Sequence, residues 1–207
     1  MKRAAGCLRV LGWMLLMLGV LEGGAALADL TKGPYTFHDN AFADAAFLVN
    51  ASVMPFGAAT SELALTGPDL GSYITDFNDG EIIRLEFTDN WIVNDAGADL
   101  VLFEIGVEEA FDVAVYPGDS PSFTSYVQYL PVDIGVVDDA PNNAAAIDLA
   151  DFGLGPTDVV HKILVRSAAL NGSEISGAGA LHSLPEPATL ALVGAGLAAG
   201  VLLRRRA

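Results

Sequence analysis

Apolar and polar side chains alternate with a period of two in several short segments of the chain. In residues 83–88 and 111–116 every second side chain is apolar, and Pro117-Gly118-Asp119 follows the second segment as a turn signal. Residues 100–103 are apolar without interruption, which is typical of a strand covered on both faces. The pattern therefore predicts β-strands at the centre of the chain.

Further segments rich in β-branched and aromatic residues extend this prediction. Residues 123–130 and 159–165 have strand composition, and residues 47–53 and 61–65 are additional candidates. Only residues 142–149, which are rich in alanine, favour a helical turn, and Gly153 and Gly155 would end it. Many short strands separated by turn signals predict an all-β fold, a β-sandwich, with a jelly-roll-like arrangement as one form of it.

The N-terminus has the order of a secretory signal. Three basic residues precede an apolar run at 11–21, which Glu22 ends before it reaches the roughly 20 residues of a spanning helix. Small residues follow at the positions that signal peptidase requires. We expect a signal helix over residues 1–28 that signal peptidase removes, with Ala26, Ala28 and Asp29 forming the cleavage site.

The C-terminus has three parts in a fixed order. Residues 185–187 read Pro-Glu-Pro, residues 188–203 carry no charge, and three arginines follow. The positive-inside rule places those arginines on the cytoplasmic side of a short transmembrane helix, and the chain before Pro185 outside the cytoplasm. The residues of this tail that would act as a signal are Pro185, Glu186, Pro187, Arg204, Arg205 and Arg206.

These ends divide the chain into a signal peptide (1–28), an ectodomain (29–184) and a sorting and anchor segment (185–207). The ectodomain contains 24 acidic and four basic side chains, so its net charge is −20. Such a charge disfavours nucleic acid and anionic lipid, and favours solubility or the binding of cations. The single cysteine, Cys7, lies in the signal peptide, so a disulfide within the ectodomain is excluded.

An Asx-rich loop between two expected strands is the best candidate for a metal site. Its oxygen ligands for calcium would be Asp89, Asn94, Asp95 and Asp99, with Glu104 downstream. A second cluster, at residues 138–148, has the same character. Asp and Asn are also the ordinary residues of turns, because their side chains bind nearby backbone, and we favour that interpretation. Calcium is therefore the one candidate cofactor, and the sequence identifies none with certainty.

The ectodomain offers no recognisable catalytic set. It has no G-x-S-x-G nucleophile elbow, no H-E-x-x-H zinc helix and no phosphate-binding glycine loop, and its histidines are scattered. We therefore expect no enzyme. Trp91, Tyr116, Tyr126 and Tyr129 are candidates for a sugar-stacking face, although aromatic residues of a small sandwich, Trp91 among them, belong more often to the core.

The tail closely resembles the PEP-CTERM sorting signal of Gram-negative bacteria that make extracellular polysaccharide. In that family a membrane protease, exosortase, processes the protein near Pro-Glu-Pro, which stands here at 185–187. Residues 88–104, 146–154 and 179–181 are similar to stretches of exported PEP-CTERM proteins and related cell-surface β-sandwich proteins. The resemblance implies a surface module and no reaction. An ordinary C-terminal anchor that is never processed is the alternative for the tail.

The combined expectation is an exported protein of the cell surface or extracellular matrix, such as a biofilm matrix, with a structural or interaction role. Its partners would be signal peptidase, an exosortase and, transiently, the inner membrane, with no nucleic acid. The alternative is a surface module that binds calcium or extracellular polysaccharide. A secreted hydrolase with an unrecognised site is the third hypothesis.

Overall fold

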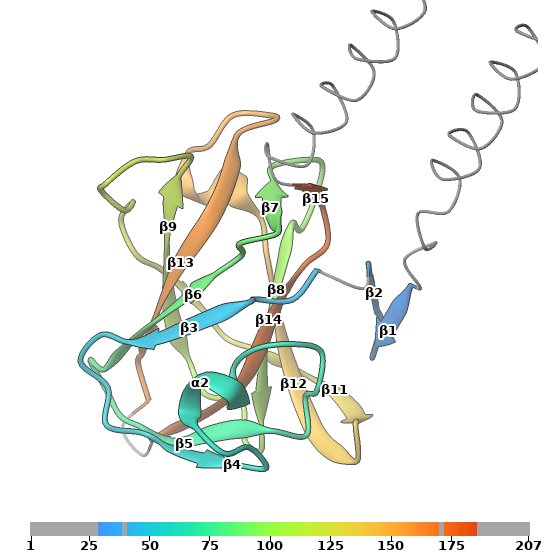
Figure 1. Cartoon of the computed structure of the whole chain (residues 1–207), viewed down its shortest axis with the longest axis vertical. Coiled ribbons are helices and arrows are strands. Elements are labelled where there is room, and N and C mark those ends of the chain that lie inside the picture. Colours follow the sequence, from blue (N-terminus) through green and yellow to red (C-terminus); the bar gives the residue numbers. More distant parts are fainter. Residues whose placement is uncertain (1–28, 39–40, 170–171, 186–207) are drawn as a thin grey trace, which may run out of the picture.

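The structure, a computed structural model, describes residues 29–38, 41–169 and 172–185. The expected signal helix and the expected transmembrane helix lie outside these residues. Within them, no helix is long and apolar enough to cross a membrane. The described part is an all-β sandwich of two antiparallel sheets with a small hairpin on one side (Figure 1).

The first sheet has seven strands and follows the order β10-β9-β13-β6-β3, with β7 pairing β13 and β15 pairing β7. The strands are β3 (Ala45–Leu48), β6 (Ile82–Glu86), β7 (Asn90–Val93), β9 (Phe111–Pro117), β10 (Val127–Tyr129), β13 (Val159–Ser167) and β15 (Ser183–Pro185).

The second sheet has six strands in the order β11-β12-β8-β14-β5-β4. They are β4 (Met54–Phe56), β5 (Tyr73–Phe77), β8 (Leu100–Ile105), β11 (Val132–Val137), β12 (Ala140–Ile147) and β14 (Ser173–Ala180). Two short helical turns, α2 (Ser61–Ala64) and the 3-10 turn η1 (Leu149–Phe152), complete the domain with the hairpin β1 (Leu30–Lys32) and β2 (Tyr35–Phe37).

The six-stranded sheet is covered on both faces. One face packs on the seven-stranded sheet through the main core, to which β8 contributes Leu100 and Leu102. The other face carries a second core that includes Val101 and Phe103 of β8 together with Phe37 of the hairpin. In Figure 1 the β1–β2 hairpin lies to the right of β8, far from β9 and β13. The uninterrupted apolar run of β8 is thereby explained, and the expectation of a strand covered on both faces is confirmed.

Most of the predicted strands are present. Alternation at 83–88 corresponds to β6, with Ile83 and Leu85 fully buried, and alternation at 111–116 corresponds to β9. Strand β13 covers 159–165 and extends to Ser167. Two candidates are only partly strand, because 123–130 contributes β10 alone and 47–53 contributes the end of β3.

Two local predictions are wrong. Residues 61–64 form the helical turn α2, with Leu65 as its C-cap, and the N-cap Thr60 accepts the Leu63 N–H at 3.2 Å. Residues 142–147 belong to strand β12, which pairs with β8, and the helical turn begins only at Leu149. Alanine hides the alternation there, since Ala144 faces the second core and Ala145 faces the main core. Tertiary packing has overridden the helix propensity of alanine.

The pattern also fails to reveal strand β14, a central strand that contains Gly177 and Gly179. A Cβ atom at Gly179 would lie 2.8 Å from Cε1 of Phe37. Glycine is therefore required at this position because the Phe37 ring packs directly on the backbone of the strand.

Candidate functional site

The outer face of the seven-stranded sheet, which we call the open face, is the side turned away from the main core. Ile163 and Val165 of β13 point into that core, so Lys162, Leu164 and Arg166 point outward. The register places Tyr116 and Glu86 on either side of Lys162. It also places Arg84 between Leu164 and Phe47 of β3, and Asp112 opposite Arg166.

Aromatic rings on this face are held by arginine side chains and by one another. The Arg84 guanidinium lies 4.3 Å from the centre of the Phe47 ring, and the Arg166 guanidinium lies 4.2 Å from that of Tyr126. Phe123 lies between Tyr116 and Tyr126, with ring centres 5.7 and 5.8 Å away. Such contacts fix the rings, which lowers the entropy that a ligand loses on binding.

Trp91 extends the open face at its β7 end. Its neighbour Ile92 is fully buried in the main core, so Trp91 points outward, and its ring stacks on that of His161 with centres 5.3 Å apart. Burial lowers the pKa of His161, and nearby Lys162 lowers it further. The expectation that Trp91 belongs to the core is therefore wrong, since it is a half-buried residue of the open face.

The open face also gathers most of the basic residues of this acidic domain. Arg84, Lys162 and Arg166 are three of the four bases in residues 29–184. Arg84 forms an ion pair with Glu86 at 2.8 Å, and the Arg166 Nε donates to Asp112 at 3.0 Å. The face is consequently close to neutral while the domain as a whole is strongly negative.

Tyr129, the fourth aromatic candidate, does not join this face. It packs against the main core, and its hydroxyl donates to Asp151 at 2.9 Å. Burial raises the pKa of Tyr129, and the neighbouring Asp151 carboxylate raises it further. Sequence reasoning thus found Trp91, Tyr116 and Tyr126 but missed Phe47 and Phe123, which only the strand register and the ring contacts reveal.

The expected calcium ligands are distributed along strand β7 and the loop after it. The structure places Asn94, Asp95 and Asp99 in the loop that joins β7 to β8, whereas Asp89 precedes β7. A strand rises about 3.4 Å per residue, so Asp89 lies at the opposite end of β7 from that loop. The backbone N–H of Asp89 donates to Asp44 at 3.3 Å.

The polar side chains of the 94–99 loop already hold local backbone. Asp99 is fully buried and accepts the N–H groups of Asp95 at 2.8 Å and Leu149 at 3.0 Å. The Asn94 amide donates to the carbonyls of Leu154 and Gly155, each at 2.9 Å. In the part of the chain that the structure describes, no three His, Cys, Asp or Glu side chains are grouped to hold a metal ion. A calcium site at this loop stays a prediction.

Glu104 lies at the far end of β8 from Asp99 and is fully buried. The pKa of its carboxyl is raised to about 8, mainly by burial. The Asn143 amide, which donates to the carboxyl at 3.0 Å, lowers the pKa, and the charge of Glu109 raises it. The raised pKa favours the protonated carboxyl at neutral pH. The sequence signal for such a group is an acidic residue inside an apolar run.

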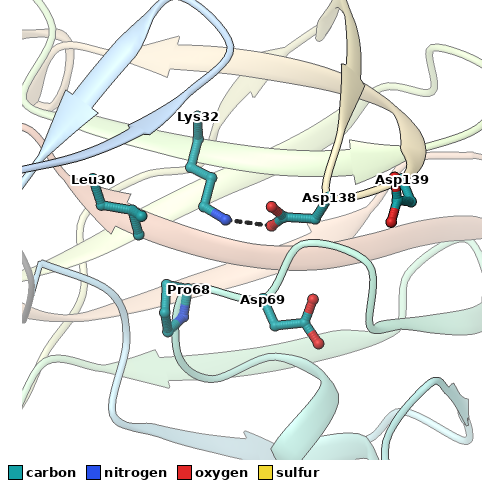
Figure 2. Close-up of a pocket in the computed structure, with 6 residues that line it drawn as sticks. All are labelled: Leu30, Lys32, Pro68, Asp69, Asp138 and Asp139. Atoms are coloured by element: carbon teal, nitrogen blue, oxygen red, sulfur yellow. Dashed lines mark hydrogen bonds and ion pairs between the residues drawn. The ribbon is translucent and has the colours of Figure 1, made fainter.

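A pocket of about 420 Å³ lies where the β1–β2 hairpin meets the β11–β12 turn (Figure 2). Figure 2 shows the Lys32 ammonium directed at the Asp138 carboxylate, with which it forms an ion pair. Asp138 also accepts the Leu70 N–H at 2.9 Å. These groups fasten the hairpin to the six-stranded sheet, which leaves Asp69 and Asp139 as the acidic lining of the pocket.

The last described strand joins the C-terminal tail to the sandwich. Strand β15 pairs antiparallel with β7, with Ser183 opposite Ile92, Leu184 opposite Trp91 and Pro185 opposite Asn90. Residues 183–206 match the model of the PEP-CTERM protein-sorting motif. The chain carries a PEP-CTERM sorting signal. The match supports an exported protein that an exosortase sorts, and it confirms the resemblance seen in the tail.

Solved structures resemble this chain at low identity. They include the CBM32 of AlyQ in complex with 4,5-unsaturated mannuronic acid (10% identity, TM-score 0.35, 67% of this chain and 98% of that chain). Another is the family 32 CBM from C. perfringens NanJ in complex with galactose (6% identity, TM-score 0.40, 65% of this chain and 90% of that chain). A third is CsCBM6-3 from Clostridium stercorarium in complex with cellobiose (15% identity, TM-score 0.34, 77% of this chain and 98% of that chain). Likenesses at these TM-scores assign no ligand. No match was found among curated proteins.

Proposed function

We propose that this protein is a non-enzymatic module of the cell surface or extracellular matrix that binds an extended, neutral polysaccharide across its open face. The observation that carries the proposal is the register of β9, β13, β6 and β3. It sets Tyr116, Lys162 and Glu86 in one row and Arg84 and Phe47 in the next.

The chemistry of these rows matches that of a sugar chain. A pyranose ring offers apolar C–H groups on its faces and hydroxyl groups at its rim. Aromatic rings such as Tyr116 and Phe123 suit the apolar faces, while carboxylates, guanidinium groups and ammonium groups bond hydroxyls as acceptors or donors. Among the described residues no second layer covers this face of the sheet, which leaves room for a chain of several sugars.

The charge distribution favours a neutral glycan over an acidic one. Arg84 and Arg166 are each paired with a carboxylate, so Lys162 is the one basic residue of the open face without an ion pair among the described residues. The net charge of −20 on residues 29–184 repels an acidic polysaccharide at low ionic strength.

Binding of the purified full-length protein to immobilised neutral and acidic polysaccharides would test the proposal. We expect retention on a neutral polysaccharide and a loss of about tenfold in affinity for Tyr116→Ala combined with Phe123→Ala, because each ring would bury apolar surface against a sugar at about 25 cal/mol per Å². Phe56→Ala is the matched control, because Phe56 is an exposed aromatic residue on the six-stranded sheet. Absence of retention on every glycan, or an equal loss in the control, would refute the open face as a glycan site.

Delivery to the surface is the second part of the proposal. A signal peptide over residues 1–28, a short membrane helix over 188–203 and processing near Pro-Glu-Pro would together place the sandwich outside the cell. The mass and the location of the mature protein are to be compared in cells with and without the exosortase. The same comparison is made between the native motif and the variant Glu186→Ala. We expect a form lacking residues from Ala188 onward at the surface only when the enzyme and the motif are both intact. Persistence of the tail in every case would indicate an ordinary anchor.

A further inference from the structure

The sorting signal begins inside the folded domain. The matched motif starts at Ser183, and the structure shows Ser183, Leu184 and Pro185 as strand β15 at the edge of the seven-stranded sheet. The Val93 N–H donates to the His182 carbonyl at 2.9 Å. Hydrogen-bonded and non-hydrogen-bonded pairs alternate along antiparallel strands, so Val93–His182 and Trp91–Leu184 are hydrogen-bonded pairs. The pairs Ile92–Ser183 and Asn90–Pro185 are not. Pro185 therefore stands opposite Asn90 at a position that needs no N–H group, which is where a strand accepts proline.

A buried carboxylate holds the chain just before β15. The Nδ1 atom of His182 lies 2.9 Å from Oδ1 of Asp99, and the Leu181 N–H donates to the Asp99 carbonyl at 2.8 Å. Asp99 is fully buried, and its two carboxylate oxygens also accept the N–H groups of Asp95 and Leu149. The carboxylate that holds His182 therefore also binds the backbone of the loop between β7 and β8 and of the turn η1.

We propose that strand β15 gates processing of the sorting signal, with His182 and Asp99 as positioning residues that hold the gate closed. A protease binds several residues in extended form on each side of the bond that it cleaves. The residues directly before Glu186 are those of β15, and one edge of that strand is occupied by β7. Processing next to Pro-Glu-Pro therefore requires β15 to separate from β7 first.

The geometry of β15 allows such opening without unfolding of the domain. The strand makes three residue pairs with one neighbour, and Leu184 is 49% exposed. Short edge elements with few buried contacts open locally at a small fraction of the global free energy of unfolding. When opening is fast, the rate of cleavage follows the population of the open form.

A reversible cross-link tests the gate directly. Ser183→Cys with Ile92→Cys places two cysteines at facing, non-hydrogen-bonded positions, where Cα atoms are about 4.5 Å apart and a disulfide fits. Cleavage of the exported full-length precursor is followed in membranes that contain the exosortase, before and after addition of a reductant. We expect no product while the disulfide is intact and product once it is reduced. The single variant Ile92→Cys controls for the change in packing at Ile92.

The anchor is tested by substitution at His182. We expect His182→Ala to speed processing about tenfold, because it removes one hydrogen bond to a charged group. In His182→Asn an amide nitrogen can replace Nδ1, and we expect the wild-type rate. His38→Ala, at an exposed histidine that pairs with Asp29, is the control and should change nothing.

Two results would overturn the gate. If the cross-linked precursor is processed as fast as the reduced one, the exosortase accepts β15 in its docked state. If His182→Ala slows processing or leaves it unchanged, the anchor does not restrain the motif. The gate rests on the proposed processing by an exosortase. Absence of product from the wild-type precursor would refute that processing, whereas the two results above refute the gate alone, and neither concerns glycan binding.

Discussion

The two sheets of the sandwich differ in what lies on their outer faces. The six-stranded sheet is covered by the β1–β2 hairpin, whose Phe37 ring lies 4.9 Å from that of Phe42 and 5.9 Å from that of Phe103. The open face of the seven-stranded sheet carries half-buried aromatic and charged side chains instead. One sheet therefore uses its outer face for stability, and the other leaves its outer face available for a ligand.

The largest difference should appear when one aromatic residue is truncated on each outer face and the two losses of stability are compared. Phe37 is 1% exposed, so we expect Phe37→Ala to lower the free energy of unfolding by about 3–5 kcal/mol. Phe47, on the open face, is 42% exposed, and Phe47→Ala should cost less than about 1 kcal/mol. Urea unfolding of both variants measures the difference. Similar losses would mean that the two faces contribute equally to stability.

A smaller effect should follow from adding one methyl group under the hairpin. Gly179→Ala sets a Cβ atom 2.8 Å from the Phe37 ring, and overpacking of this kind costs about 1–3 kcal/mol. Gly155→Ala is the matched control, since the nearest atom there is an Asp158 oxygen at 3.5 Å. A melting temperature of Gly179→Ala equal to that of the control would indicate that the hairpin does not pack tightly.

The six-stranded sheet also buries a titratable group, Glu104 of β8, and this group makes the stability of the domain depend on pH. The folded-state pKa of Glu104, about 8, lies above the ordinary value of 4.5. Because its pKa is raised in the folded state, Glu104 contributes to the free energy of unfolding when it is protonated. That contribution is fully present below pH 4.5 and is lost as the pH rises to about 8. We expect Glu104→Gln to flatten this decline in unfolding experiments between pH 5 and 8. Glu108→Gln, at an exposed carboxyl, should leave the decline as it is.

The smallest effect is expected at the loop that connects the two sheets. Asp99 and Asn94 already bind backbone groups, so calcium, compared with magnesium, should move the melting temperature by no more than about 1 °C. A clear rise with calcium alone would show that the loop rearranges into a cation site. Asp95→Asn should abolish that rise, because Asp95 is the exposed carboxylate of the loop.

Sequence reasoning predicted part of the open face and none of its arrangement. Alternation identified the strands β6 and β9, the β-branched composition of 159–165 identified β13, and the search for aromatic residues near predicted loops or strand edges supplied Trp91, Tyr116 and Tyr126. The rows that bring Arg84 beside Phe47, and Tyr116 beside Lys162, depend on pairings between residues that are far apart in the chain. A period-two pattern fixes which side chains share a face of one strand, but not which strands are neighbours.

The sequence by itself determined the all-β class, the acidity of the domain and the sorting signal, because local periodicity, charge and short motifs need no partner elsewhere in the chain. The tertiary structure decided that residues 142–147 are strand, that glycine is required at Gly179, and that the sorting signal begins as strand β15. Each of these depends on a contact between segments distant in sequence, and the free energy of such contacts outweighs local propensity.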